Sequence, residues 1–220
     1  MAEIEFEKAA QLSPRSPEVH AIWATALRMA KKYKGADKHF AKANELAHED
    51  EEILLNWGMS KLMNGQIESA IELMEKAVVF NPDNALTYNY LGKAYGHRKE
   101  YATEEASYRK ALELQPDFAQ AHFNLAVVLS LGNKFDDAAA HFKIAVGLDR
   151  QFNKPFVERF LAQYDMVKET QESKEVGTPK EKAQATKLDP NAVKREEFQS
   201  EDFQLIDYKS FNRIPASMVV

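Results

Sequence analysis

The chain has 220 residues, of which 45% are hydrophobic, a content typical of folded proteins and sufficient for a sizeable core. Its net charge of −5 gives no basic footprint of the kind that nucleic-acid-binding proteins carry, so we expect no nucleic-acid partner. Because there are no cysteines, disulfides, thiolate metal ligands and cysteine nucleophiles are excluded.

Residues 1–16 are predicted to form a single helix that carries Phe6, Ala9 and Leu12 and ends at Pro14. They match the second half of a unit found further along the chain, and no first half precedes them. Either a lone capping helix opens the fold, or the sequence is a fragment of a longer protein. No signal-peptide pattern or membrane-spanning apolar run is present, so we expect a cytoplasmic location, although a fragment could lack its targeting signal.

Four units of one pattern follow, at residues 17–50, 51–84, 85–118 and 119–152. Each is predicted to be two short helices with a break between them. Residues of the same class recur every 34 residues, which is the mark of a repeat array. In the third unit the first helix has one face of Tyr88, Leu91, Gly92 and Tyr95, and the second helix has Tyr108, Ala111, Leu112 and Leu114, followed by Pro116.

These units resemble tetratricopeptide repeats (TPRs), whose pattern is W-x2-L-G-x2-Y, A-x3-F and P. In the third unit Leu91-Gly92, Tyr95, Ala111 and Pro116 fill family columns. The resemblance implies an all-α fold, a right-handed α-solenoid of helix-turn-helix repeats. One position departs from the pattern, because Glu104 stands where a small residue belongs. The pattern therefore does not fix the helix crossing in the third repeat.

After the repeats, helical spacing of Phe156, Phe160 and Tyr164 predicts a capping helix over 153–168. Residues 169–202 are rich in Glu, Lys, Gln, Thr and Pro, and are predicted to be a disordered linker. The final segment, 203–220, is apolar again and is predicted to dock, either on this molecule or on a second copy. Its docking residues would be Phe203, Leu205, Ile206, Tyr208, Phe211 and Ile214.

In TPR proteins the first helix of each repeat lines a concave face, so the resemblance implies that a partner binds there. Helix geometry then selects the residues that point away from the second helix of the pair. Methionine adapts to varied shapes, and asparagine both donates to and accepts from a peptide backbone. Alternatively, some of these side chains pack between neighbouring first helices. The predicted partner-binding residues are Thr25, Met29, Leu55, Asn56, Met59, Met63, Asn89, Tyr90, Lys93, His97, Phe123, Asn124, Val127 and Leu131.

TPR domains that bind chaperone tails hold a carboxylate with a clamp of Lys, Asn and Arg. That clamp is incomplete here, since Ala21, Gln120 and Phe123 replace expected cations. Asn56 and Asn124 resemble two rungs of the asparagine ladders that other TPR superhelices, such as those of glycosyltransferases, use for extended chains.

No catalytic residue, cofactor or metal site is predicted, because the sequence has no nucleophile–base pair, phosphate loop or glycine-rich turn. The histidines raise the alternative of a metal-binding site. His20 shares a repeat column with His122, and His39 shares one with His141, so the members of each column would lie far apart. We interpret them as solvated or packing residues.

The leading functional hypothesis is a non-catalytic scaffold or adaptor whose groove binds a peptide or protein segment, with possible regulation by its own tail. The alternatives are the interaction region of a larger enzyme or of an envelope, secretion or pilus assembly protein, and a module that self-associates through the tail. The expected partner is a protein or peptide.

Overall fold

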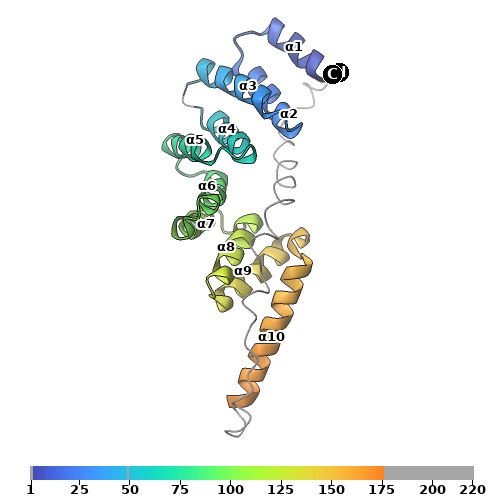
Figure 1. Cartoon of the computed structure of the whole chain (residues 1–220), viewed down its shortest axis with the longest axis vertical. Coiled ribbons are helices and arrows are strands. Elements are labelled where there is room, and N and C mark those ends of the chain that lie inside the picture. The colour runs from blue at the N-terminus through green and yellow to red at the C-terminus, as the bar shows by residue number, and fades with distance from the viewer. Residues whose placement is uncertain (1, 49, 176–220) are drawn as a thin grey trace. The chain divides into compact units, whose positions relative to one another are not determined.

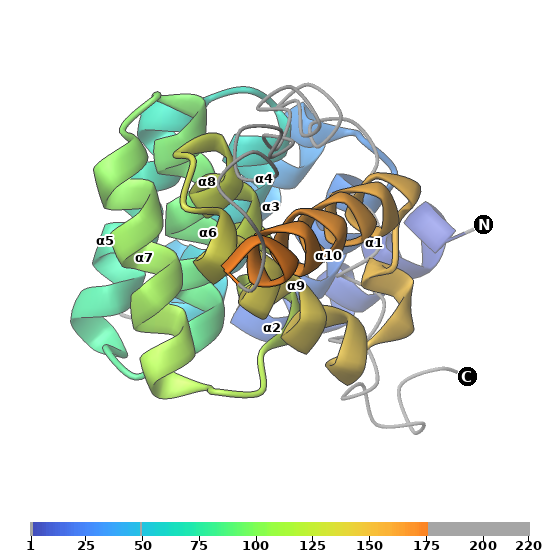
Figure 2. The same cartoon turned by 90° about the horizontal axis from the view of Figure 1, so that it is seen from below.

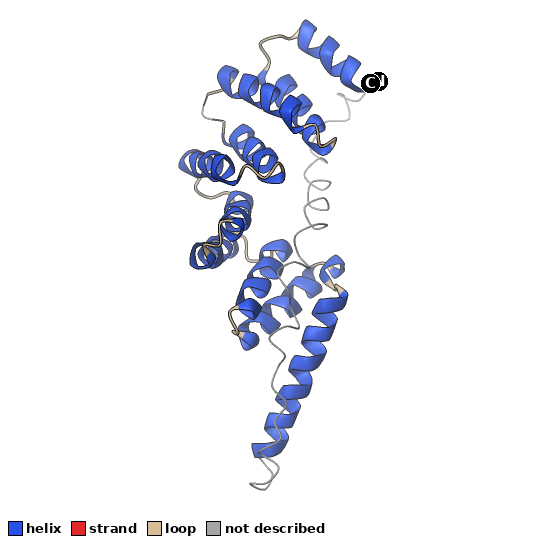
Figure 3. Cartoon of the chain, viewed as in Figure 1, coloured by secondary structure: helices blue, strands red, loops and turns tan. Residues whose placement is uncertain are grey.

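The computed structural model describes residues 2–48 and 50–175, which form helices joined by turns (Figures 1 and 3). This described part contains no strand, which confirms the predicted all-α fold. The predicted docking segment 203–220, and the predicted linker beyond Glu175, lie outside the described residues. In chain order the elements are α1 (Ala2–Leu12), α2 (Pro17–Met29), α3 (Tyr33–Leu46), α4 (Glu51–Met63), α5 (Ile67–Phe80), α6 (Ala85–His97), α7 (Tyr101–Leu114), α8 (Ala119–Leu131), α9 (Phe135–Leu148), the 3-10 turn η1 (Arg150–Phe152) and α10 (Pro155–Glu175).

The chain divides into two compact units, with the boundary between Ala121 and His122 near the start of α8. Helices α1 to α7 belong to the first unit, and most of α8 with α9, η1 and α10 belongs to the second. In the first unit α2 packs on α3, α4 on α5 and α6 on α7 (Figure 1; Figure 2 gives the view from below). Each of these pairs is one helix-turn-helix repeat.

The first helix of each repeat in the first unit begins at a side-chain cap. Ser16, Asp50 and Asn84 each accept a hydrogen bond from a backbone N–H of the following turn, at 3.2, 2.9 and 2.9 Å. These N–H groups have no carbonyl partner within the helix, so the caps satisfy donors that would otherwise be unpaired. Pro17 follows Ser16 directly, at a position where a missing N–H costs nothing.

The turn between the two helices of a repeat uses one left-handed residue at the same register in all four repeats. These residues are Lys31 (φ 58°), Gly65 (φ 76°), Lys99 (φ 64°) and Asn133 (φ 59°). Only glycine adopts this conformation without steric cost, and asparagine tolerates it better than most residues. The two lysines therefore hold an unfavourable backbone conformation that the helix pairing imposes.

Replacing Lys99 with glycine should raise the free energy of unfolding by about 0.5–1 kcal/mol. A lysine in the left-handed region costs about 1–2 kcal/mol, and glycine at the same position avoids this cost. The greater conformational freedom of glycine in the unfolded chain offsets about half of that gain. Urea unfolding followed by circular dichroism measures the change. Lys76→Gly, inside α5, is the control and should lose about 1 kcal/mol. Equal losses of unfolding free energy in Lys99→Gly and Lys76→Gly would contradict the left-handed conformation of Lys99.

Small residues let the paired helices approach closely. A Cβ atom added to Gly92 would lie 2.6 Å from Cε1 of Tyr108, and one added to Gly58 would lie 2.8 Å from Cγ of Met74. The alanines of the repeat columns are fully buried, as the small columns predict: Ala36, Ala43, Ala70, Ala77, Ala111, Ala138 and Ala145. Large residues of one helix thus sit against small residues of its neighbour.

The third repeat reverses this arrangement at one position. Glu104 is buried on α7, and a Cβ added to Gly96 of α6 would lie 2.5 Å from its Oε1 atom. In the second repeat the same two positions hold Leu62 and Ala70, so the large residue is on the first helix and the small one on the second. Gly96 therefore makes the room that Glu104 needs, and the helix pairing survives the departure from the family pattern.

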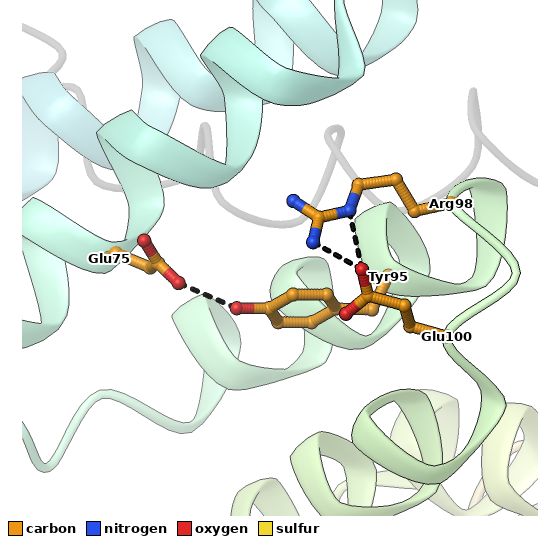
Figure 4. A network of polar contacts seen from close by, with 4 residues as sticks. All are labelled: Glu75, Tyr95, Arg98 and Glu100. Atoms are coloured by element: carbon orange, nitrogen blue, oxygen red, sulfur yellow. Dashed lines mark hydrogen bonds and ion pairs between the residues drawn. The ribbon is translucent and has the colours of Figure 1, made fainter.

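Polar side chains join each repeat of the first unit to the next. Asp37 of α3 accepts hydrogen bonds from Nε1 of Trp57 at 3.1 Å and from Nζ of Lys61 at 2.7 Å, both on α4. Between α5 and α6, the Tyr95 hydroxyl donates to Oε1 of Glu75 at 2.6 Å (Figure 4). The Tyr95–Glu75 bond is exposed and adds little, whereas the two bonds to Asp37 are partly buried. All three link neighbouring repeats.

The Tyr95 hydroxyl also predicts a dependence of stability on alkaline pH. Burial, followed by the hydrogen bond to Glu75, raises the pKa of Tyr95 to about 12, against about 10 in an unfolded chain. The unfolded state therefore ionises first, so stability contributed by this group is present below pH 10 and is lost as pH rises toward 12. Tyr95→Phe should show a shallower loss of stability over that range in urea titrations; parallel curves would contradict the prediction.

The second unit is built around an aromatic cluster. Phe142 of α9 is fully buried, and its ring centroid lies 5.8 Å from Phe123 of α8 and 6.1 and 5.3 Å from Phe156 and Phe160 of α10. Several of these ring pairs are edge-to-face, the geometry that aromatic rings prefer. Helix α10 thus covers the apolar side of the last repeat.

Helix α10 is longer than the capping helix predicted from the sequence. The prediction ended at residue 168, and the helix continues to Glu175. Residues 169–175 are polar, which favoured a linker, but Glu, Gln and Lys have high helix propensity and can extend an existing helix without burying a face.

Candidate functional site

Helices α2, α4 and α6, the first helices of the repeats in the first unit, form a layer that we name the first-helix layer. They contact one another in sequence, α2 with α4 and α4 with α6. The close approaches of Gly58 to α5 and of Gly92 to α7 mark the side of this layer that faces the second helices. Residues about half a helical turn away from these glycines lie on the opposite side.

The predicted binding residues on this layer differ in exposure. Met29 is 39% exposed and His97 is also exposed. Side chains that are half-buried are Thr25, Asn56, Met63 and Lys93. Those that are buried are Leu55, Met59, Asn89 and Tyr90. The exposed and half-buried group is therefore the part of the predicted site whose substitution best preserves the fold.

Three of the polar groups on the layer contact residues of their own helix. Oγ1 of Thr25 donates to the Ala21 carbonyl at 2.9 Å, and Nδ2 of Asn56 donates to the Glu52 carbonyl at 2.9 Å. Nζ of Lys93 lies 5.7 Å from the ring centroid of Tyr90, a cation–π distance. These contacts orient the side chains, so a partner would meet an ordered surface.

Arg28 is a residue of this layer that the sequence prediction missed. It is the largest fully buried side chain among the described residues, at 1% exposed, and its Nη1 donates to Sδ of Met63 at 3.6 Å. It therefore connects α2 with α4. It occupies the repeat position of Leu62 and Gly96, which face the second helices, so helix geometry alone does not select it for the binding face.

In the second unit the structure corrects one predicted binding residue. Phe123 is 2% exposed and packs against Phe142, Phe152 and Phe156, so it belongs to the aromatic core rather than to an open face. The reason is that η1 and α10 cover this side of α8, as the position of their rings shows. Val127 and Asn124 are also buried, and Leu131 is half-buried.

Comparison with protein families agrees with this geometry. A family model described as "TPR repeat" matches residues 58–97, and two described as "Tetratricopeptide repeat" match residues 85–118 and 105–151. The chain contains tetratricopeptide repeats. The matches run from Gly58 in the second repeat, through the third, to Gln151 in the fourth.

This TPR protein is similar to a peroxisomal targeting signal receptor of Saccharomyces cerevisiae, at 31% identity over 45% of this chain and 16% of the receptor. The chain spans about a fifth or less of the length of the peroxisomal receptors it matches. Among solved structures, Pseudomonas aeruginosa pilF has a TM-score of 0.62 at 20% identity, covering 75% of this chain and 80% of pilF. YrrB, described as a TPR protein with an unusual peptide-binding site, has a TM-score of 0.58 at 18% identity, covering 73% of this chain and 84% of YrrB.

The family matches and the receptor relatives support a protein-interaction scaffold with a protein or peptide as the partner. The solved structures are below 25% identity and show the fold alone. Among the described helices of this TPR protein, none is both long and apolar enough to cross a lipid bilayer.

Proposed function

We propose that this TPR protein is a non-catalytic scaffold that binds an extended or helical segment of a partner protein along the first-helix layer. The observation that carries the proposal is the adaptable, partly accessible surface formed by Met29 and Met63 with the asparagine amide of Asn56. Methionine side chains fit varied apolar shapes, and an amide can pair with a peptide backbone. The yeast relative is named a peroxisomal targeting signal receptor, which supports the same class of function.

The test compares three baits in affinity capture followed by mass spectrometry: the full chain, Met29→Ala/Asn56→Ala, and a control. The control, Lys76→Ala/Val79→Ala, also replaces one polar and one apolar exposed residue, but on α5. A partner held by the full chain and the control should be lost or weakened at least about fivefold by the first variant, about 1 kcal/mol. Equal capture by all three baits would remove the proposal.

A second candidate function concerns the apolar segment 203–220, which lies outside the described residues. We propose that it competes for the first-helix layer or joins two copies, because six large apolar residues follow a polar stretch. Cutting the chain after Glu175 keeps α10 whole. The shortened chain should bind a captured partner more tightly, or lose self-association in light scattering. Equal affinity and equal mass per particle in both forms would remove this candidate.

A further inference from the structure

Two histidine pairs lie between the first and second helices of their repeats. Nδ1 of His20 on α2 lies 3.2 Å from Nδ1 of His39 on α3. Nδ1 of His122 on α8 lies 2.7 Å from Nδ1 of His141 on α9. In the sequence His20 and His122 share a repeat column. In the structure each histidine instead lies beside the one 19 positions later in its own repeat. Both pairs have the same register, in the first and the fourth repeat.

The fold does not need histidine at these positions. The equivalent residues are Leu54 and Leu73 in the second repeat, and Tyr88 and Ser107 in the third. An apolar pair packs there without any polar group, so the imidazoles are not required for helix pairing. Two ring nitrogens at hydrogen-bond distance also cannot both carry a proton between them, so at least one offers its lone pair.

The distance in the first pair suits a shared metal ion. A tetrahedral ion bonded to two imidazole nitrogens at about 2.0–2.1 Å holds them about 3.3 Å apart. His20 and His39 are within about 0.1 Å of that separation, whereas His122 and His141 would have to open by about 0.6 Å. The first pair is therefore the better-shaped site.

We propose that His20 and His39 form a two-nitrogen binding site for an imidazole-preferring transition-metal ion, Cu²⁺ or Zn²⁺. Calcium and magnesium prefer oxygen ligands and would not compete. Among the described residues, no cluster of three or more His, Cys, Asp or Glu side chains is placed to hold an ion. The protein thus supplies two ligands, and water fills the remaining positions.

The surroundings of the pair allow an ion to enter and to be detected. His39 is half-buried, so the site is not sealed. Lys38 neighbours His39 in the chain and repels a cation, which sets an upper limit on affinity. The indole of Trp23 stacks on His39 with 3.8 Å between ring centroids, so it reports directly on this imidazole.

The experiment titrates Cu²⁺ into the untagged full chain near pH 7.5 and follows tryptophan emission. Trp57→Phe leaves Trp23 as the single tryptophan, since the chain has two. In this background we expect saturable quenching that a chelator reverses. His20→Leu, which copies the residue of the second repeat, should weaken the apparent affinity at least about tenfold. His48→Ala, outside both pairs, should leave the titration unchanged.

A second measurement needs no histidine variant. Addition of Zn²⁺ to the isotope-labelled chain should shift the imidazole NMR signals of His20 and His39 and leave that of His48 in place. Absence of saturable quenching by Cu²⁺ together with unshifted His20 and His39 signals would overturn the proposal. The proposal would also be overturned if a His20→Leu variant, shown by circular dichroism to be folded, bound Cu²⁺ with the same apparent affinity as the parent.

Discussion

Replacing Phe142 with alanine should lower the free energy of unfolding of the second unit by about 3–5 kcal/mol. The side chain is fully buried and its ring contacts Phe123, Phe156 and Phe160. Alanine would leave a cavity among three rings held by two other helices, α8 and α10, which cannot both move fully inward. The loss would also weaken the contact between α10 and α9, since two of the three rings lie on α10.

Urea unfolding followed by far-UV circular dichroism measures this loss. Phe80→Ala is the matched control, because Phe80 ends α5 and is 43% exposed. It should cost no more than about 1 kcal/mol, since little apolar area is removed from the interior. Similar losses in the two variants would show that the aromatic cluster is not the core of the second unit.

The second large effect is expected in the third repeat. Gly96→Leu should destabilise the first unit by about 3 kcal/mol or more, because the new side chain would occupy the space of the Glu104 carboxylate. Glu104→Ala alone should cost less, since it leaves a small space beside a glycine.

The double variant Gly96→Leu/Glu104→Ala should recover most of the stability lost in Gly96→Leu. It restores the large–small order that Leu62 and Ala70 show in the second repeat. The coupling energy between the two positions should be favourable and about 2–3 kcal/mol, measured by a double-mutant cycle of unfolding free energies. Additive losses would mean that Gly96 and Glu104 do not share one space.

The sequence predicts the repeat fold well because the residue pattern that determines each helix pair is local and occurs in four repeats. Ala43, Ala77 and Ala145 recur at a fixed interval, and each is fully buried where a neighbouring helix approaches. Periodicity alone therefore gives the helices, their pairing and the small columns. The left-handed turn position was not predicted, because only Gly65 and Asn133 suit it, and lysine occupies it in the other two repeats.

The features that escaped prediction depend on two residues from different helices at once. Glu104 contradicts the family pattern until Gly96 is seen opposite it. A comparison of equivalent positions in the repeats does not detect the His20–His39 pair, because the two residues occupy different positions of the repeat. Phe123 has the spacing of a binding residue, but its environment is set by the chain after the last repeat.

The candidate binding surface was predicted only in part for a related reason. Helix geometry selects a face, and it does not say how far neighbouring helices cover that face. Met29 and Asn89 were selected by the same rule, yet Met29 is 39% exposed and Asn89 is fully buried. Arg28 was left out because its position faces the second helices, yet its long side chain reaches Met63 on α4. How far a side chain is buried depends on packing between helices, and the geometry of a single helix does not include that packing.

The most direct test of the scaffold account is the footprint of a captured partner on this TPR protein, measured by hydrogen–deuterium exchange. A partner bound there should slow exchange in the first-helix layer, in the segments of α2 and α4 that carry Met29, Asn56 and Met63, and leave α3, α5 and α7 unchanged. Slower exchange confined to the second helices, with the first-helix layer unaffected, would contradict it.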